Sequence, residues 1–171
     1  MLDNSVLEQE PRDKEVSSAY SLIVKQVGAL IEDEHDLIAN LANVSAVLFN
    51  NLDDVNWAGF YLFKEGELVL GPFQGQAACI RIPMNKGVCG TAAFKKEAVL
   101  VDNVHEFSGH IACDAASNSE IVIPIIVEQK LIGVLDIDSP RYSRFNLDDL
   151  NALSRIVKLI EENITQGKPL L

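Results

Sequence analysis

The sequence predicts a single α+β domain built on an antiparallel sheet. Amphipathic helices are predicted near both ends, over residues 16–31 and 146–164, where apolar residues recur every three or four positions. Between them, apolar runs are joined in pairs by short polar turns, around Gly66 and around residues 128–130, as expected for β-hairpins. Hairpin-linked strands pair antiparallel, so we expect a central sheet of about six strands flanked by the N- and C-terminal helices.

The composition fits one globular domain. The chain has 171 residues, of which 48% are hydrophobic and 23% charged, which excludes a disordered chain, a collagen-like repeat and a disulfide-rich mini-protein. The net charge of −11 disfavours nucleic acids and anionic membranes as partners. No segment reaches the roughly 18 apolar residues of a membrane span, and the acidic N-terminus contains no apolar signal segment. We therefore expect a cytoplasmic protein.

The domain is predicted to occupy residues 15–165, with a polar lead-in over residues 1–14 and a tail over residues 166–171. Asp33 is expected to cap the second helix, because a short polar side chain there precedes an apolar periodicity. Four residues form the apolar face of that helix: Leu37, Leu41, Val44 and Leu48. Asn146 is expected at the start of the last helix, and the apolar face of that helix is expected to begin at Leu147.

The middle of the chain combines short elements with one long connection. A short strand is predicted from Cys79 to Ile82, ended by Pro83, followed by a short helix over Gly87–Lys95. The polar segment 102–119 has no clear periodicity. It is longer than most connections between elements, and such loops are usually functional or disordered. We expect it to carry part of a functional site.

The chain has three cysteines, Cys79, Cys89 and Cys113. Cys113 is in the long polar loop and is the candidate nucleophile, since a thiolate reacts according to its pKa and its access. Cys89 lies near the start of the short helix, where the helix N-terminus and Lys86 would favour the thiolate. We expect Cys113 and Cys89 to form a redox pair. Cys79, placed in a strand, is the cysteine expected to be structural.

Two other chemistries remain open for these cysteines. His105, His110, Cys113 and Cys89 offer four ligand types that zinc accepts. The chain contains no Cys-x-x-Cys pair, however, so a metal site is not the favoured interpretation, and no metal ligand is expected. A Cys–His pair for acyl transfer is the other alternative, with His105 or His110 as the base.

Three acidic and two aromatic residues complete the candidate site. Glu120 opens one strand of the second hairpin, while Asp136 and Asp138 close the other, which places all three carboxylates at one end of the sheet. Mutual repulsion would raise at least one of their pKa values and make that group a general acid. Trp57 and Tyr61 share one strand face and could hold a methyl group or a cation. A solvated strand end and two core rings are the alternative interpretations.

Four segments of the chain resemble the GAF-domain family of free methionine-(R)-sulfoxide reductases. They are NWAGFYL, KGVCGTAA, GHIACDAASNSEIV and GVLDIDSP, and the resemblance extends from the first helix to the last. It implies a GAF fold and the thiol-dependent reduction of free methionine-(R)-sulfoxide to methionine. Many GAF domains bind ligands without these cysteines, so a non-catalytic binding or sensor module is the alternative.

The resemblance also implies a role for each candidate residue. Cys113 matches the nucleophile, Cys89 the resolving cysteine, and Cys79 a third cysteine that takes part in disulfide exchange. The residues that match the substrate site are Glu120, Asp136, Asp138, Trp57 and Tyr61. A Cys113 sulfenic acid would condense to an intramolecular disulfide. The resemblance further implies a homodimer, thioredoxin as the external reductant and no bound cofactor.

Overall fold

The computed structural model describes the backbone of residues 10–167 and the side chains of residues 18–167. Within this part of the chain, a six-stranded sheet has the order β3-β2-β1-β6-β5-β4, and all neighbouring strands are antiparallel. The strands are β1 (Trp57–Lys64), β2 (Glu67–Gly75), β3 (Arg81–Pro83), β4 (Val99–Val101), β5 (Ser119–Val127) and β6 (Lys130–Ser139). The predicted α+β class and antiparallel sheet are confirmed.

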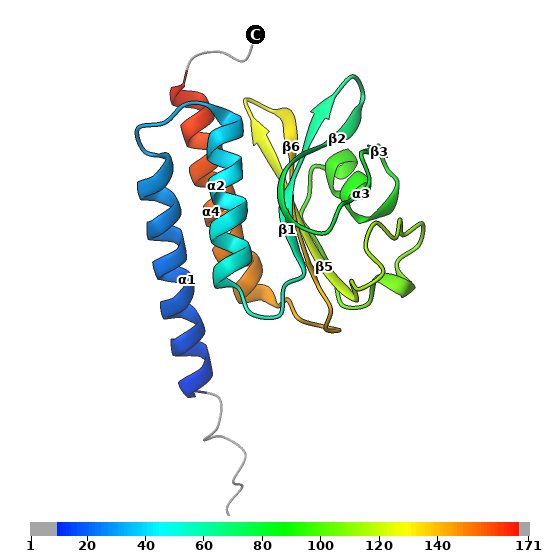
Figure 1. The fold of residues 1–171 in the computed structure, drawn as a ribbon, viewed down its shortest axis with the longest axis horizontal. Helices are drawn as coiled ribbons and strands as arrows, with labels where there is room; N and C mark the ends of the chain where they lie inside the picture. Colours follow the sequence, from blue (N-terminus) through cyan, green and yellow to red (C-terminus); the bar gives the residue numbers. More distant parts are fainter. Residues whose placement is uncertain (1–9, 168–171) are drawn as a thin grey trace, which may run out of the picture.

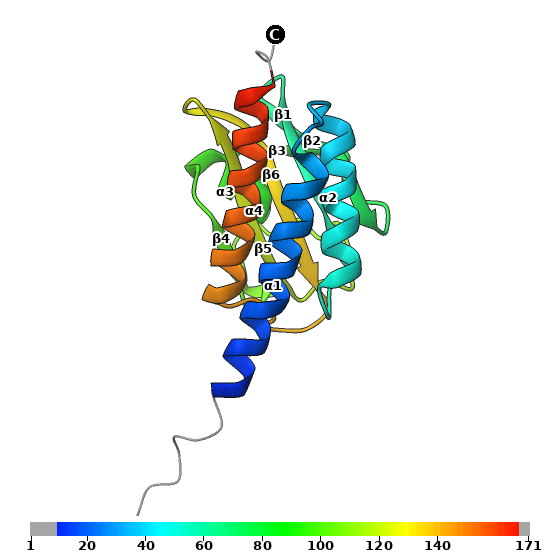
Figure 2. The same ribbon diagram turned by 90° about the vertical axis from the view of Figure 1, so that its left-hand side faces the viewer.

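Long helices cover one face of the sheet, and a short helix covers the other (Figure 1). The helices are α1 (Glu10–Ile31), α2 (Leu37–Asn51), α3 (Gly87–Lys95) and α4 (Leu147–Gln166), with a 3₁₀ turn at Val104–Glu106. α2 packs on β1 and β2, α4 packs on β5, and α1 lies outside them against α2 and α4. Figure 2 shows these three helices in front of the sheet. The α3 side is therefore left for the loops that carry the cysteines.

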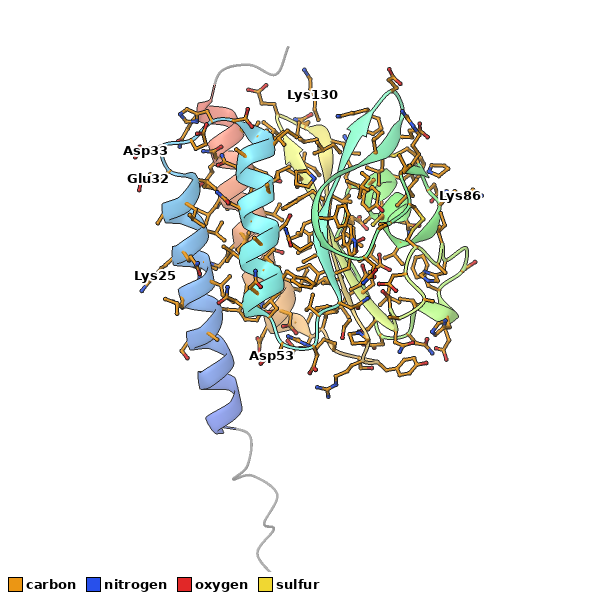
Figure 3. The ribbon with its side chains drawn as sticks, in the orientation of Figure 1. Lys25, Glu32, Asp33, Asp53, Lys86 and Lys130 are labelled. Atoms are coloured by element: carbon orange, nitrogen blue, oxygen red, sulfur yellow. A yellow bond between two sulfur atoms is a disulfide. The ribbon has the colours of Figure 1, made fainter. Side chains whose placement is uncertain are left out.

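Two helix starts differ from the sequence predictions. α1 begins at Glu10, so the expected polar lead-in of residues 1–14 overlaps the helix, and residues 1–9 and 168–171 lie outside the described residues. α2 is capped by Asp36, whose carboxylate accepts a hydrogen bond from the Ala39 amide at 2.9 Å. The prediction that Asp33 caps α2 is wrong, because Asp33 lies in the turn at the end of α1 (Figure 3).

α3 and α4 begin where the sequence predicts. α3 spans Gly87–Lys95 as expected, and α4 starts with a capping box in which the side chains of Asn146 and Asp149 each accept a hydrogen bond from the other residue's amide. Leu147 was expected on the apolar face but is 71% exposed. The buried face of α4 runs through Asp149 and Leu153. Asp149 is two residues, or about 200° of helical rotation, from Leu147.

The sheet separates two hydrophobic cores. Side chains alternate along β1, so Phe60 and Leu62 pack in the core beneath α1, α2 and α4, whereas Trp57 and Tyr61 pack in the core beneath α3. Residues 57–62 are buried without interruption. The α3 side of β1 is thus an interior region.

The register of the central strands gathers the predicted site residues at one end of the sheet. Trp57 pairs with Asp138, which pairs on its other side with Glu120. Two residues along β6, and therefore on the same face, Asp136 pairs with Gly59. The expectation that the start of β5 lies beside the end of β6 is confirmed.

A buried asparagine joins α4 to the turn between α1 and α2. The Asn163 amide donates hydrogen bonds to the carbonyls of Ile31 and Glu34 at 2.7 and 2.9 Å and accepts one from Asn40 at 3.1 Å. Because Asn163→Leu removes all of them, we expect a loss of about 2 kcal/mol in unfolding free energy. For a domain of this size, the melting temperature should fall by roughly 4–8 °C. Asn50→Leu, at an exposed position of α2, is the control and should change stability by less than about 0.5 kcal/mol.

Candidate active site

A pocket opens between the sheet and the loops around α3. Its cavity volume is about 30 Å³, within a larger hollow that is open to solvent. Except for Cys79, every residue predicted to form the site lines it: Trp57, Tyr61, Cys89, Cys113, Glu120, Asp136 and Asp138. Lys86 also belongs to the lining, and Figure 3 shows its side chain on the outer side of α3, away from the sheet. The register of the sheet and the position of α3 thus bring the candidate residues into one cavity.

A disulfide bond joins Cys79 to Cys113, with their Cα atoms 5.3 Å apart. Cys79 belongs to the connection between β2 and β3 rather than to a strand, because β3 begins only at Arg81. The bond therefore fastens the long loop before β5 to the opposite wall of the pocket. The expected pairing of Cys113 with Cys89 is wrong for this structure, in which Cys79 is the partner of Cys113.

Cys89 remains a thiol, and it is buried. Its sulfur donates a hydrogen bond to Glu120 Oε1 at 3.8 Å. Burial, followed by the charges of Asp136, Glu120 and Asp138, raises the pKa of Cys89 well above its ordinary value. The expectation that Lys86 and the helix N-terminus lower this pKa is wrong, because the side chain points into the acidic interior. At neutral pH Cys89 is a protonated thiol rather than a nucleophile.

The three carboxyl groups share the floor of the pocket. Burial raises the pKa of Glu120 and of Asp138 well above ordinary values, and neighbouring carboxylates add to the effect. Burial also raises the pKa of Asp136 to about 6. The predicted direction is therefore confirmed, although loss of water contributes more than mutual repulsion. Asp136 Oδ1 is buried and has no hydrogen-bond partner among the described residues. These groups are suited to hold or donate a proton near neutral pH.

An aromatic wall forms one side of the pocket. The rings of Trp57 and Tyr61 are stacked with centroids 5.9 Å apart, and Phe73 stacks on Trp57 at 5.2 Å. The indole N–H donates to the Gln76 carbonyl, and the Tyr61 hydroxyl donates to the Cys79 carbonyl. The second bond holds the aromatic wall against the segment that carries the disulfide. Both rings expose their apolar surfaces to the cavity.

The segment around Cys113 is held by side chains that the sequence analysis did not select. Asn56 precedes the aromatic strand, and its amide donates to Asp114 Oδ2 at 2.9 Å and to Ser117 Oγ at 3.1 Å. Asp114 and Ser117 line the pocket beside Cys113. The one signal in the sequence was the position of Asn56, immediately before Trp57. These contacts fix the loop independently of the disulfide.

The two histidines occupy different positions. His110 lines the pocket, and burial, followed by the charge of His105, lowers its pKa. His105 is exposed and its Nε2 is 2.9 Å from Asn118 Oδ1. The alternative zinc set of both histidines with Cys89 and Cys113 is not formed, since Cys113 is in a disulfide. Nor does any hydrogen bond among residues 18–167 join a histidine to a cysteine, as an acyl-transfer pair would require.

Comparisons with known proteins agree with this geometry. The GAF domain profile matches residues 32–165. The chain is 50% identical over 143 residues to the free methionine-R-sulfoxide reductase of Escherichia coli, covering 84% of this chain and 87% of that protein. The chain belongs to the GAF-domain family of free methionine-R-sulfoxide reductases.

One solved structure and one further relative extend the similarity. The Staphylococcus aureus enzyme, whose structure was solved in complex with its substrate, has a TM-score of 0.82 and 55% identity. The match covers 85% of this chain and 95% of that one. Protein YtsP of Bacillus subtilis is 52% identical over 162 residues, which cover 94% of this chain and 98% of that protein. The predicted GAF fold is thereby confirmed over nearly the whole described chain.

Proposed function

We propose that this chain reduces free methionine-R-sulfoxide to methionine with electrons from Cys113 and Cys79. The observation that carries this proposal is the Cys79–Cys113 disulfide at a pocket with a carboxyl floor and an aromatic wall. The relatives named for this reaction are half identical to the chain over most of its length. A ligand-binding module would need no pair of cysteines at the mouth of its cavity.

The reaction takes two steps at the cysteines. The Cys113 thiolate attacks the sulfoxide sulfur, the oxygen is transferred to Cys113 as a sulfenic acid, and methionine leaves. The Cys79 thiolate then attacks Cys113 Sγ and expels the hydroxyl group as water, which forms the disulfide. Cys79 is therefore assigned the resolving role that the sequence interpretation gave to Cys89. Buried Cys89 stays protonated in the floor of the pocket.

The carboxyl groups supply the proton that the sulfoxide oxygen needs. A neutral carboxylic acid near the substrate protonates the oxygen as the sulfur is attacked, and a pKa near the working pH is best for such a donor. Burial gives Asp136 a pKa of about 6, which meets this condition. Trp57 and Tyr61 provide an apolar surface for the methyl and methylene groups of the substrate.

The same carboxyl groups explain a preference for the free amino acid. An α-ammonium group brought among Glu120, Asp136 and Asp138 stabilises the ionised form of one of them, whereas an uncharged amide does not. We therefore expect N-acetyl-methionine-R-sulfoxide to show at least about a tenfold lower kcat/KM. Steady-state rates for the two compounds at equal reductant concentration test this. Equal kcat/KM values would contradict recognition of the ammonium group.

The disulfide must be reduced before the next cycle. Both cysteines are partly exposed, so a dithiol protein of the thioredoxin type can attack the bond by exchange. We further propose that the chain acts as a homodimer in the cytoplasm without a bound cofactor. No helix in residues 10–167 has the length and hydropathy needed to cross a bilayer.

Thioredoxin-coupled NADPH oxidation with separate R and S epimers tests the function. We expect turnover with the R epimer of free methionine sulfoxide and not with the S epimer. Chemical reduction by dithiothreitol, in place of thioredoxin, separates a failure of catalysis from a failure of recycling. Absence of turnover with both reductants would favour a GAF module that only binds a ligand.

A further inference from the structure

One group of side chains in the pocket has the spacing of metal ligands, and it includes Cys89, to which the proposed reductase mechanism gives no role. Ligand atoms of Cys89, Glu120 and Asp136 all lie within 4.8 Å of one another, and the three residues come from α3, β5 and β6. All three residues are buried, with exposed fractions of 4%, 6% and 6%. Within the described residues, Asp136 Oδ1 is buried and has no hydrogen-bond partner. A buried, unpaired carboxylate oxygen calls for a donor or a cation.

We propose that Cys89, Glu120 and Asp136 form a binding site for a borderline-soft divalent cation such as Zn²⁺. Zinc binds cysteine at about 2.3 Å and carboxylate at about 2.0–2.2 Å, so tetrahedral coordination separates sulfur from oxygen by roughly 3.5 Å. The observed distance from Cys89 Sγ to Glu120 Oε1 is 3.8 Å. A shift of a few tenths of an ångström would complete this pair of ligands.

The donor set selects the class of metal. A thiolate disfavours Mg²⁺ and Ca²⁺, which prefer oxygen ligands, and it favours Zn²⁺ or its spectroscopic substitute Co²⁺. Three protein ligands leave a fourth tetrahedral position, which faces the pocket that these residues line. The proposed cation thus occupies the pocket floor. This proposal differs from the prediction made from the sequence, in which no residue binds a metal.

The charge of the surroundings favours a cation at this position. Asp138, a further carboxyl group, lines the same pocket as the three ligands. A divalent cation replaces the protons that the ligands otherwise hold, so binding releases protons. The net charge of −11 also attracts cations to the chain.

The cation has a consequence that rests on the proposed function. The cation and the sulfoxide require the same carboxyl groups, so the two should exclude each other. Zn²⁺ should then inhibit the reductase competitively, raising the apparent KM for methionine-R-sulfoxide while kcat at saturating substrate stays constant.

Titration of the disulfide-bonded protein with Co²⁺ tests the site without any measurement of activity. In this form Cys89 is the single thiol of the chain, which has three cysteines, so a thiolate-to-cobalt charge-transfer band reports on it alone. We expect one equivalent of Co²⁺ to produce the band and one equivalent of Zn²⁺ to abolish it. Excess Mg²⁺ should leave the band unchanged.

Three variants and one control complete the test. Cys89→Ser should eliminate the band, and Glu120→Gln and Asp136→Asn should each weaken Co²⁺ binding at least tenfold. Glu161→Gln changes a partly buried carboxyl group outside the pocket and should bind as the wild type does. Circular dichroism shows whether each variant is folded. No band in the wild type, or an affinity unchanged in folded Asp136→Asn, would overturn the proposal even if the reductase proves active.

Discussion

Cys113→Ser should form no methionine from methionine-R-sulfoxide, whereas Cys79→Ser should form one methionine per chain and then stop. The difference follows from the two steps at the disulfide. Cys113 receives the oxygen, and Cys79 is needed only to remove it as water. With thioredoxin present, we expect a loss of at least a thousandfold in kcat for Cys113→Ser and of about a hundredfold or more for Cys79→Ser.

Quenched single-turnover reactions of the reduced proteins measure this directly. Methionine is quantified against protein, and mass spectrometry with a sulfenic-acid reagent identifies the oxidised cysteine. Cys89→Ser serves as the matched control, because it removes the third thiol and leaves the disulfide pair intact. It should still form the Cys79–Cys113 bond on oxidation by substrate. A Cys89–Cys113 bond in the wild type after one turnover would return the resolving role to Cys89.

The arrangement of the carboxyl groups could be predicted from the sequence because it depends on short-range geometry. A hairpin with a short turn fixes its own register, and the period of two along a strand fixes which side chains share a face. Glu120, Asp136 and Asp138 therefore had to meet at one end of the sheet. The pairing of Trp57, on β1, with Asp138 joins strands far apart in the sequence and does not follow from the hairpin. The predicted bounds of α3 are confirmed as well: Gly87, which has a positive φ, begins the helix, and Lys96 in the αL region follows its last residue.

The cysteine pairing could not be predicted in the same way. Cys79 follows β2 and Cys113 precedes β5, in two connections that have no periodicity, and β1 and β6 separate these strands in the sheet. The pKa of Cys89 was misjudged because its position near the start of a helix indicated a thiolate, while tertiary packing buried the side chain against three acids. Asp33 and Asp36 are equally good caps by residue type. The length of the turn decided between them.

Asp136→Asn should make the protein more stable at pH 7 while lowering kcat/KM at least a hundredfold. The carboxyl group has an ordinary pKa of 3.8, and burial raises the pKa of Asp136 to about 6 in the folded chain. Between these values the folded state binds the proton more tightly than the unfolded state, so unfolding free energy falls as pH rises. The difference corresponds to roughly 3 kcal/mol, an upper bound for the gain from a neutral amide.

The pH dependence separates this explanation from a general effect of charge. Below about pH 3 the carboxyl group is mostly protonated in both states, so wild type and Asp136→Asn should melt at similar temperatures. Above about pH 6 the variant should melt roughly 2–8 °C higher, since the buried amide offsets part of the gain. Melting curves of the disulfide-bonded proteins in EDTA test this. Asp33→Asn removes the same charge from an exposed turn and should not raise the melting temperature at either pH. A variant that is less stable than the wild type at pH 7 but fully active would show that the Asp136 carboxylate serves the fold and not the reaction.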